Sequence, residues 1–292
     1  MLNPADAFRM TWENLMHECP DVHEVKQLVG GSINHVFRVE SDRGIFVMKI
    51  NSLAKYPEMF KTEARGLTTL SETKSISCPE VIGYSELESH QILLIEYIQE
   101  GKPLNDFFED FANRLATLHR VTSSHFGLKY NNYIGRLSQD NTEEKTILDF
   151  FIQRRLLPQL HLAVKSETLD TSSRTKFDVL LKKLPSLLPN EEAALLHGDL
   201  WSGNFIAGEN GTVSLIDPAI HYGSRESEIA MTKLFGGFDH SFYSTYQNAF
   251  PMQNRWEERV DLWNLYPLLV HVNLFGTSYI PDLIRILNKY VV

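Results

Sequence analysis

The hydrophobic pattern of this chain changes character near residue 100, and this change constrains the fold more than any other feature. Before it, apolar residues fall in short β-type runs separated by turn residues, with one helical segment at 58–70. The run at 91–98 is almost continuously apolar, which predicts a buried central strand. A polar segment at 99–104 follows, and beyond it the apolar spacing is mainly helical, for example at 143–164.

This order of elements predicts an α+β protein built from two lobes. We expect a small β-rich N-terminal lobe at 1–98, a hinge at 99–104 and a larger, mainly helical C-terminal lobe at 105–292. A short β-type run at 212–217 interrupts the helical part. A chain of 292 residues is long enough to give two lobes a substantial core.

The charge and the cysteines argue against several classes of protein. Lys and Arg number 28 against 37 Asp and Glu, and no basic run offers a surface for nucleic acid. The most apolar helical stretch, 262–276, is too short and too polar to span a bilayer. Cys19 and Cys78 belong to no CxxC pattern, and the start MLNPADAFRM lacks the pattern of a signal peptide. We therefore expect a cytoplasmic monomer that binds neither nucleic acid nor membrane.

The stretch HGDLWSGNF, residues 197–205, carries the strongest chemical signal. Asp199 and Asn204 have the spacing of the Asp and Asn in the HRDxxxxN loop of protein kinases, and Asp217 follows a short β-type run. In such a loop the first Asp accepts the proton of the attacking hydroxyl, while the Asn and the second Asp hold Mg²⁺ against the nucleotide phosphates. Because Asp and Asn also cap turns, this interpretation rests on the whole set. It makes Asp199 the catalytic base and Asn204 and Asp217 the metal ligands.

A lysine in the β-rich part completes this set. The run FVMKI resembles the VAIK strand of protein kinases, which predicts that Lys49 contacts the α- and β-phosphates of ATP. Its expected partner is an acid on the next helix, either Glu63 or, as a second choice, Glu58. A lone Lys–Glu pair would be an ordinary surface ion pair. No GxxxxGK[ST] motif is present, so a Walker-type nucleotide site is not supported.

Two backbone segments are further candidates for nucleotide contact. The loop in GGSINHVFRV joins two expected strands, and its amides could bind phosphate, although taken alone the segment favours an ordinary hairpin turn. Its two adjacent glycines also depart from the GxGxxG pattern of protein kinases. The strand before the hinge would offer backbone groups to adenine. The candidates are Gly30, Gly31, Ser32 and Asn34 for the phosphates, and Glu96, Tyr97 and Ile98 for the adenine.

Three segments, HGDLWSGN, IDPAIHYGSRESEIAMTKLFGGF and LYPLLVHVNLFG, resemble the fructosamine (ketosamine) kinase family. This family belongs to the aminoglycoside-phosphotransferase and choline-kinase-like branch of the protein-kinase-like fold, and the resemblance covers nearly the whole chain. It implies a bilobal fold whose N-terminal lobe binds ATP. It also implies Mg²⁺-dependent phosphorylation of a sugar hydroxyl of a ketoamine: a ribulosamine, erythrulosamine or fructosamine adduct of an amine or lysine. The labile ester would then release the amine, which is deglycation.

Substrate residues follow from the resemblance and the position of each side chain. Trp201 lies between the base and a metal ligand, where its indole could pack on the substrate or brace the loop. Glu226 and Glu228 begin a helix and could meet the substrate amine, but acids at that position also suit the helix dipole. Arg225 and His221 complete the set of substrate candidates.

Two other functions remain open on the sequence. The chain could be a different small-molecule kinase that acts on an aminoglycoside, on choline or on a similar amino alcohol. It could also be a nucleotide-binding pseudokinase, although the presence of Lys49, Asp199, Asn204 and Asp217 argues against that function. Turnover of a ketoamine with ATP distinguishes the three.

Overall fold

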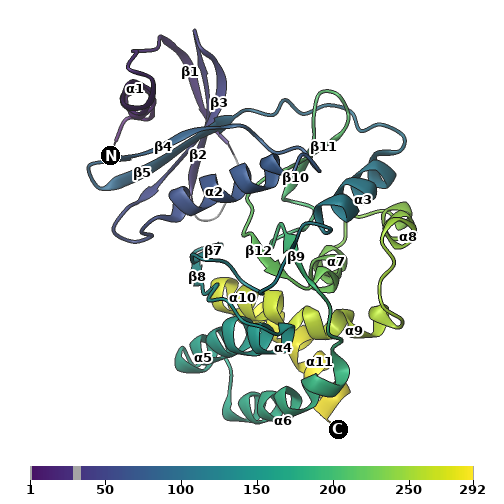
Figure 1. Ribbon diagram of the computed structural model, residues 1–292. Coiled ribbons are helices and arrows are strands. Elements are labelled where there is room, and N and C mark those ends of the chain that lie inside the picture. The colour runs from purple at the N-terminus through teal and green to yellow at the C-terminus, as the bar shows by residue number, and fades with distance from the viewer. Residues whose placement is uncertain (1, 29–33, 292) are drawn as a thin grey trace. The chain divides into compact units, whose positions relative to one another are not determined.

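The chain forms two compact units in the computed structural model, which describes residues 2–28 and 34–291. The first unit comprises Met1–Asn105 with Ile206–Pro218, and the second comprises Asp106–Phe205 with Ala219–Val292. The first contains a five-stranded sheet and the second is mainly helical (Figure 1). This confirms the predicted α+β class with a β-rich and a helical part, while the assignment of the hinge stays a prediction.

The sheet of the first unit is antiparallel throughout and has the strand order β1-β2-β3-β5-β4. As the sequence predicts, β5 lies inside the sheet, between β3 and β4, and its middle residues are buried. Beyond this sheet the unit contains most of a two-stranded ribbon of β10 and β11. The strands are β1 (Val22–Gln27), β2 (His35–Ser41), β3 (Gly44–Ser52), β4 (Val81–Leu87), β5 (His90–Glu96), β10 (Phe205–Ala207) and β11 (Val213–Leu215).

Alternation along β3 gives its two faces different partners (Figure 1). Met48 and Ile50 belong to a buried cluster with helix α1 (Pro4–Met16), which the sequence analysis left unassigned. Lys49 points to the opposite face because successive side chains of a strand alternate. There it contacts helix α2 (Met59–Glu72). The period of the strand therefore places the one lysine of β3 under α2 rather than in the apolar cluster.

Helices dominate the second unit, together with a three-stranded sheet of order β12-β9-β6. Its helices are α3 (Phe107–Leu118), α4 (Ile147–Asp149), η1 (Phe150–Leu156), α5 (Leu157–Lys165), α6 (Thr171–Leu187), α7 (Arg225–Leu234), α8 (His240–Ala249), α9 (Trp256–Trp263), α10 (Leu265–Phe275), η2 (Thr277–Tyr279) and α11 (Ile280–Val291). Its strands are β6 (Thr122–Ser123), β7 (Asn132–Ile134), β8 (Leu137–Gln139), β9 (Ala193–Leu196) and β12 (His221–Gly223). No helix within the described ranges is long and apolar enough to cross a membrane.

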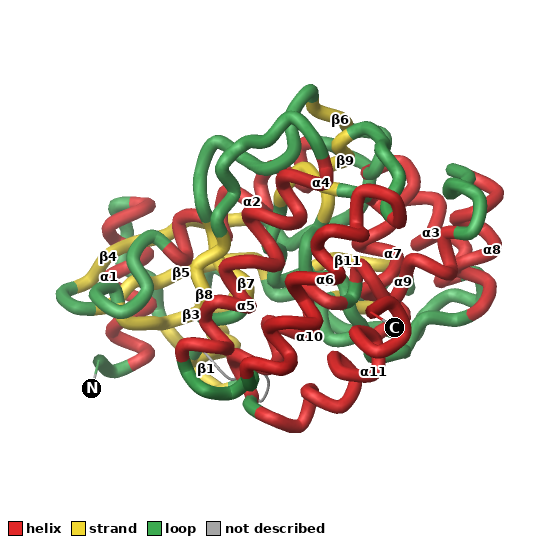
Figure 2. The backbone as a smooth tube through the Cα atoms, turned by 90° about the horizontal axis from the view of Figure 1, so that it is seen from below, coloured by secondary structure: helices red, strands yellow, loops and turns green. Residues whose placement is uncertain are grey.

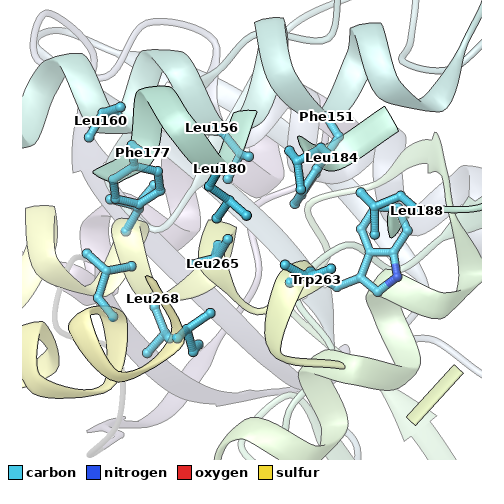
Figure 3. Close-up of a cluster of buried hydrophobic side chains, with 14 of the residues drawn as sticks. Phe151, Leu156, Leu160, Phe177, Leu180, Leu184, Leu188, Trp263, Leu265 and Leu268 are labelled. Carbon is cyan, nitrogen blue, oxygen red and sulfur yellow. The ribbon is translucent and has the colours of Figure 1, made fainter. Parts of the chain in front are cut away.

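The core of the second unit forms where η1, α5, α6, α9 and α10 meet (Figure 3). Phe151 of η1 packs edge-on against Trp263 of α9, with ring centroids 4.8 Å apart. Helix α5 packs against α10, and α6 against α11 (Figure 2). The core thus joins helices that are more than a hundred residues apart in sequence.

The helix predicted at 143–164 differs from the one observed. It begins at Ile147 and passes through the π-helix η1 before α5. The cause is Pro158, which has no N–H to donate and whose ring would clash with the carbonyl four residues earlier. In η1 the Leu157 N–H donates instead to the carbonyl of Ile152, five residues back. The spacing of apolar residues in the sequence does not reveal such a change from α-helix to π-helix.

Candidate active site

Lys49 is the centre of a charged cluster in the first unit. It is only 4% exposed, and its Nζ donates to Oε1 of Glu63 on α2 at 2.6 Å. The same ammonium donates to a carboxylate oxygen of Asp217. Glu58, the second choice as partner, pairs instead with Lys61 at the surface. The structure therefore brings together Lys49, Glu63 and Asp217 of the candidate set.

The protonation of this cluster follows from burial and charge. Burial lowers the pKa of Lys49, but Asp217 and Glu63 outweigh it, so the net pKa is raised and the ammonium stays charged at physiological pH. Burial raises the pKa of Glu63, and the neighbouring Lys49 opposes that rise. A buried cation held between two carboxylates has a fixed position, which suits contact with an anionic group such as a phosphate.

Asp217 is held in an unusual backbone conformation. The preceding strand β11 is anchored to the first unit because Leu215 N–H donates to the carbonyl of Ser77 at 2.8 Å. Asp217 itself has φ of +54° and precedes Pro218, a position that normally favours extended backbone. Its side chain is half exposed although it contacts Lys49. Strain of this kind is often found at functional sites, and Asp tolerates the left-handed region better than most residues.

The candidate adenine segment has one position with a free backbone. Glu96 N–H donates to Glu80 O at 2.8 Å, and Tyr97 N–H donates weakly to Ile45 O at 3.4 Å. Within residues 2–28 and 34–291, no backbone partner is found for the N–H or carbonyl of Ile98. Of the three candidates, Ile98 therefore differs from Glu96 and Tyr97 in having a backbone N–H to spare for a ligand.

The candidate phosphate loop is described only in part. Gly30, Gly31 and Ser32 lie outside the described residues. Asn34 is the first described residue after this gap, and its Oδ1 accepts a hydrogen bond from Asn51 Nδ2 on β3. The end of the loop is thus tied to the strand that carries Lys49.

The HGD loop of the second unit closes on itself. Asn204 Nδ2 donates to the Asp199 backbone carbonyl at 2.8 Å and to its carboxylate Oδ2 at 2.9 Å. Asn204 N–H donates to the carbonyl of Trp201 at 3.0 Å. The chain can turn here because Gly198 has φ of +83°, and a Cβ on it would lie 2.1 Å from the Ala219 carbonyl oxygen. The turn puts a carboxylate and a carboxamide in contact and leaves Asn204 Oδ1 available as an acceptor.

A buried acid fixes the backbone of this loop from behind. Glu228 of α7 accepts from His197 N–H at 3.1 Å and from Gly198 N–H at 2.6 Å. It also accepts from His119 Nε2 at 2.9 Å, and the Tyr246 hydroxyl donates to the other ring nitrogen of His119 at 2.7 Å. Sequence reasoning missed His119 and Tyr246, because a His at a helix end and a Tyr on an amphipathic helix show no pattern of their own.

The other two candidates at the start of α7 also have protein partners. Glu226 is buried and accepts from Arg259 Nε at 2.8 Å and from Trp263 Nε1 at 3.1 Å. Arg225 is buried as well and donates to the carbonyls of Phe250 and Pro251 at 2.8 and 2.7 Å. These contacts tie α7 to its neighbours, and contact of these residues with the substrate stays a prediction.

His221 lines a cavity of about 40 Å³ beside Arg155, Tyr266 and Glu228. Burial, together with the Arg155 charge, lowers the pKa of His221 well below its usual value, so the imidazole is neutral at physiological pH. Burial also lowers the pKa of Arg155, to about 10, and its Nε has no hydrogen-bond partner among the residues that the structure describes. Trp201, in contrast, is a half-exposed side chain of the HGD loop.

The two metal candidates lie in different units, Asp217 in the first and Asn204 in the second, and each offers an oxygen of the kind that Mg²⁺ takes as a ligand. No group of three His, Cys, Asp or Glu side chains in the described ranges could hold a metal ion. Mg²⁺ does not need such a group, because it takes oxygen ligands, keeps several waters and binds through one or two protein oxygens plus phosphates. Asp217 offers a half-exposed carboxylate and Asn204 offers its Oδ1.

A lysine on β3 paired with a glutamate on the following helix, and an HGD loop closed by Asn204 in a helical unit, define a protein-kinase-like phosphotransferase. The solved structure of an aminoglycoside phosphotransferase shares this fold, with a TM-score of 0.65 at 15% identity and coverage of 98% of each chain.

The family model described as "Fructosamine kinase" matches residues 6–292, and the chain belongs to this family. The "Probable ketoamine kinase" of Enterococcus faecium is 35% identical, covering 91% of this chain and 95% of that protein. The "Protein-ribulosamine 3-kinase, chloroplastic" of Arabidopsis thaliana is 34% identical, covering 92% and 83%. A "Putative fructosamine-3-kinase" from Haemophilus somnus 129PT has a solved structure with a TM-score of 0.88, 25% identity and coverage of 98% and 97%. The chain is accordingly a kinase.

Proposed function

We propose that this protein transfers a phosphoryl group from ATP, with Mg²⁺, to a sugar hydroxyl of a ketoamine. The substrates would be ribulosamine, erythrulosamine or fructosamine adducts of amines or lysine, and the labile phosphate ester would then release the amine. The contact between the Asp199 carboxylate and Asn204 carries this proposal, because it provides a base next to a metal ligand in a member of the fructosamine kinase family. The name of the Arabidopsis relative supports a ribulosamine and its 3-hydroxyl.

Each candidate residue has a role in this proposal. Asp199 would orient the sugar hydroxyl and accept its proton, and Asn204 fixes the Asp199 carboxylate through the hydrogen bond at 2.9 Å. Lys49 would bind the α- and β-phosphates, with Glu63 fixing its ammonium. Asn204 and Asp217 would hold Mg²⁺, which neutralises charge on the phosphates when bound. Gly30, Gly31, Ser32 and Asn34 would contact phosphates, and Glu96, Tyr97 and Ile98 the adenine.

The test is turnover of a ribulosamine adduct of Nα-acetyl-lysine with ATP and Mg²⁺, followed by ADP formation and by detection of the phosphorylated sugar. The Asp199→Asn variant should lower kcat by about 10²–10⁴-fold, the range expected for loss of a general base. Mg-ATP should still raise its Tm, because its nucleotide contacts are intact. Asp106→Asn, at an exposed residue with no side-chain cap bond, is the matched control and should keep full activity.

Two results would contradict the proposal. One is an Asp199→Asn variant that turns over as fast as the unaltered protein. The other is phosphorylation of an aminoglycoside or choline together with no reaction on ribulosamine, erythrulosamine and fructosamine adducts of lysine.

A further inference from the structure

Five aromatic side chains from three separate segments of the second unit form a connected group, here called the aromatic platform. Its members are Trp201 of the HGD loop, Phe235 after α7, His271 and Phe275 of α10, and Tyr279 of η2. The ring centroids of Trp201 and Phe235 lie 6.1 Å apart, and those of Phe235 and His271 lie 4.7 Å apart. His271 lies 5.4 Å from Phe275 and 4.9 Å from Tyr279 by the same measure.

The platform leaves large apolar rings in contact with solvent. Phe275 is 50% exposed, Trp201 38% and Phe235 37%. Single exposed apolar residues are ordinary on a protein surface, but a contiguous exposed patch marks a binding surface. Trp201 contacts Phe235, and His271 connects Phe235 to Phe275, so the exposed rings belong to one connected aromatic group.

One end of the platform is fixed to the candidate catalytic loop. Trp201 follows Asp199 by two residues, so their Cα atoms lie within about 7 Å of each other, the reach of two residues of extended chain. The indole lies over the backbone of Gly203, since a Cβ there would be 2.3 Å from the ring. Gly237 packs against Ser202 in the same way, since a Cβ on Gly237 would lie 2.4 Å from the Cβ of Ser202. The GGF segment after Phe235 and the HGD loop are thus interlocked, which sets the position of the platform next to Asp199.

The chemistry of the platform favours an alkyl chain and a cation over an anion. None of its five side chains is a carboxylate, an ammonium or a guanidinium. His271 Nδ1 donates to the Pro267 carbonyl at 2.7 Å, and burial lowers the pKa of His271, so the ring is neutral and its Nε2 is an acceptor. Aromatic faces attract cations, and rings of this size bury methylene groups.

We propose that the aromatic platform binds the amine side of the ketoamine, namely the alkyl chain and protonated secondary amine of a modified lysine. The inference rests on the proposed function. In a ketoamine phosphorylated at the 3-hydroxyl, the carbonyl carbon and one methylene separate the carbon that carries this hydroxyl from the amine nitrogen. With the hydroxyl at Asp199, the amine would fall near Trp201, and the lysine chain would extend over Phe235 toward Phe275. The enzyme then prefers ketoamines of lysine to those of short amines.

The test compares two substrates that share the sugar and differ in the amine: ribulosyl adducts of Nα-acetyl-lysine and of methylamine. For the unaltered protein, kcat/KM should be higher for the lysine adduct. In Phe275→Ala the ratio of the two kcat/KM values should fall about tenfold, mainly through a higher KM for the lysine adduct, as loss of roughly half of a buried Phe contact predicts. Phe275→Leu, which keeps apolar volume without the π face, should recover part of this loss.

The matched control is Tyr84→Ala, because Tyr84 is an aromatic residue of β4 with a similar exposure of 39%. It should leave the ratio unchanged. A ratio that is unaltered in both Phe275 variants, or an equal loss on both adducts, would overturn the inference while leaving the proposed function intact. If the unaltered protein phosphorylates neither adduct, the proposed function itself fails. Thermal unfolding of each variant checks that the fold is kept, which we expect because Phe275 is half exposed.

Discussion

The backbone of the HGD loop depends on one carboxylate, and the substitution Glu228→Gln tests this dependence. Glu228 accepts from the N–H groups of His197 and Gly198 and from His119 Nε2, at 3.1, 2.6 and 2.9 Å. It is 3% exposed, so bulk water has little access to its carboxylate. Gln has the same shape as Glu, but it has an NH₂ group in place of one of the two carboxylate oxygens. This NH₂ group must then face a hydrogen-bond donor.

The magnitude follows from the groups left without a partner. Oε2 of Glu228 serves two donors and Oε1 serves one, so a Gln leaves at least one buried donor unsatisfied in either orientation. Each orphaned buried donor costs about 1–3 kcal/mol, and a hydrogen bond to a charged acceptor is stronger than one to a neutral acceptor. We expect a loss of about 3 kcal/mol in the free energy of unfolding, or roughly 6–12 °C in Tm for a domain of about 150–250 residues.

The loss should depend on pH with a definite sign. Burial alone raises the pKa of Glu228, but the hydrogen bonds from His119 and Gly198 outweigh it, and the net pKa is lowered. A carboxyl group with a lowered pKa stabilises the fold above its unfolded value, about 4.3 for Glu, and this contribution disappears as the pH falls. The difference between Glu228→Gln and the unaltered protein should therefore be full at pH 7 and shrink below about pH 4.5.

The assay is urea unfolding at pH 7 and at pH 4, together with kcat on the lysine adduct. Glu143→Gln, at an exposed residue of the same unit, is the matched control and should change neither. The midpoint of Glu228→Gln should fall at constant slope, and kcat should fall with it because the loop loses its support. An unaltered midpoint and an unaltered kcat would refute the reasoning.

Two further predictions concern the two units separately. Lys49→Met removes the cation shared by two carboxylates, so the rise in Tm caused by Mg-ATP should disappear and kcat should fall at least about 100-fold; a retained shift would count against phosphate contact. Gly198→Ala should lower Tm and abolish turnover, because its Cβ meets the backbone carbonyl of Ala219 at 2.1 Å. Gly203→Ala should keep its Tm and raise KM for the lysine adduct, because its Cβ meets only the movable indole of Trp201. Equal behaviour of the two glycine variants in thermal unfolding would contradict this distinction.

The arrangement of the β-rich part could be predicted from local patterns. The antiparallel strands follow one another with short turns, and the period of two fixes which face of β3 carries Lys49. Glu63 lies on the helix that directly follows, so its contact with Lys49 depends on few long-range choices. Helix α1 was missed because it precedes the motifs. Its start does carry two signals: Asn3 caps the helix by accepting from the Ala5 N–H at 2.9 Å, and Pro4 stands in its first turn.

The support of the HGD loop could not be predicted in the same way. His119 lies 109 residues from Glu228 in sequence, and Tyr246 lies 127 residues from His119. A polar residue on one helix carries no local sign of its partner on another. The aromatic platform has the same property, since Trp201, Phe235 and Phe275 meet only after three segments have folded together.

The acids at the start of α7 show why a motif can be specific without contacting a substrate. Sequence reasoning left open whether Glu226 and Glu228 serve a substrate amine or the helix dipole, and their contacts favour a third role. Glu228 holds the HGD backbone, and Glu226 binds Arg259 and Trp263 at the other side of the helix. Breaking the Glu226–Arg259 ion pair would cost about 3–5 kcal/mol, and Glu228→Gln about 3 kcal/mol, so the spacing RExE is required by the fold whatever amine is bound. Selection of the amine can then belong to the aromatic platform, whose exposed rings cost the fold little to change.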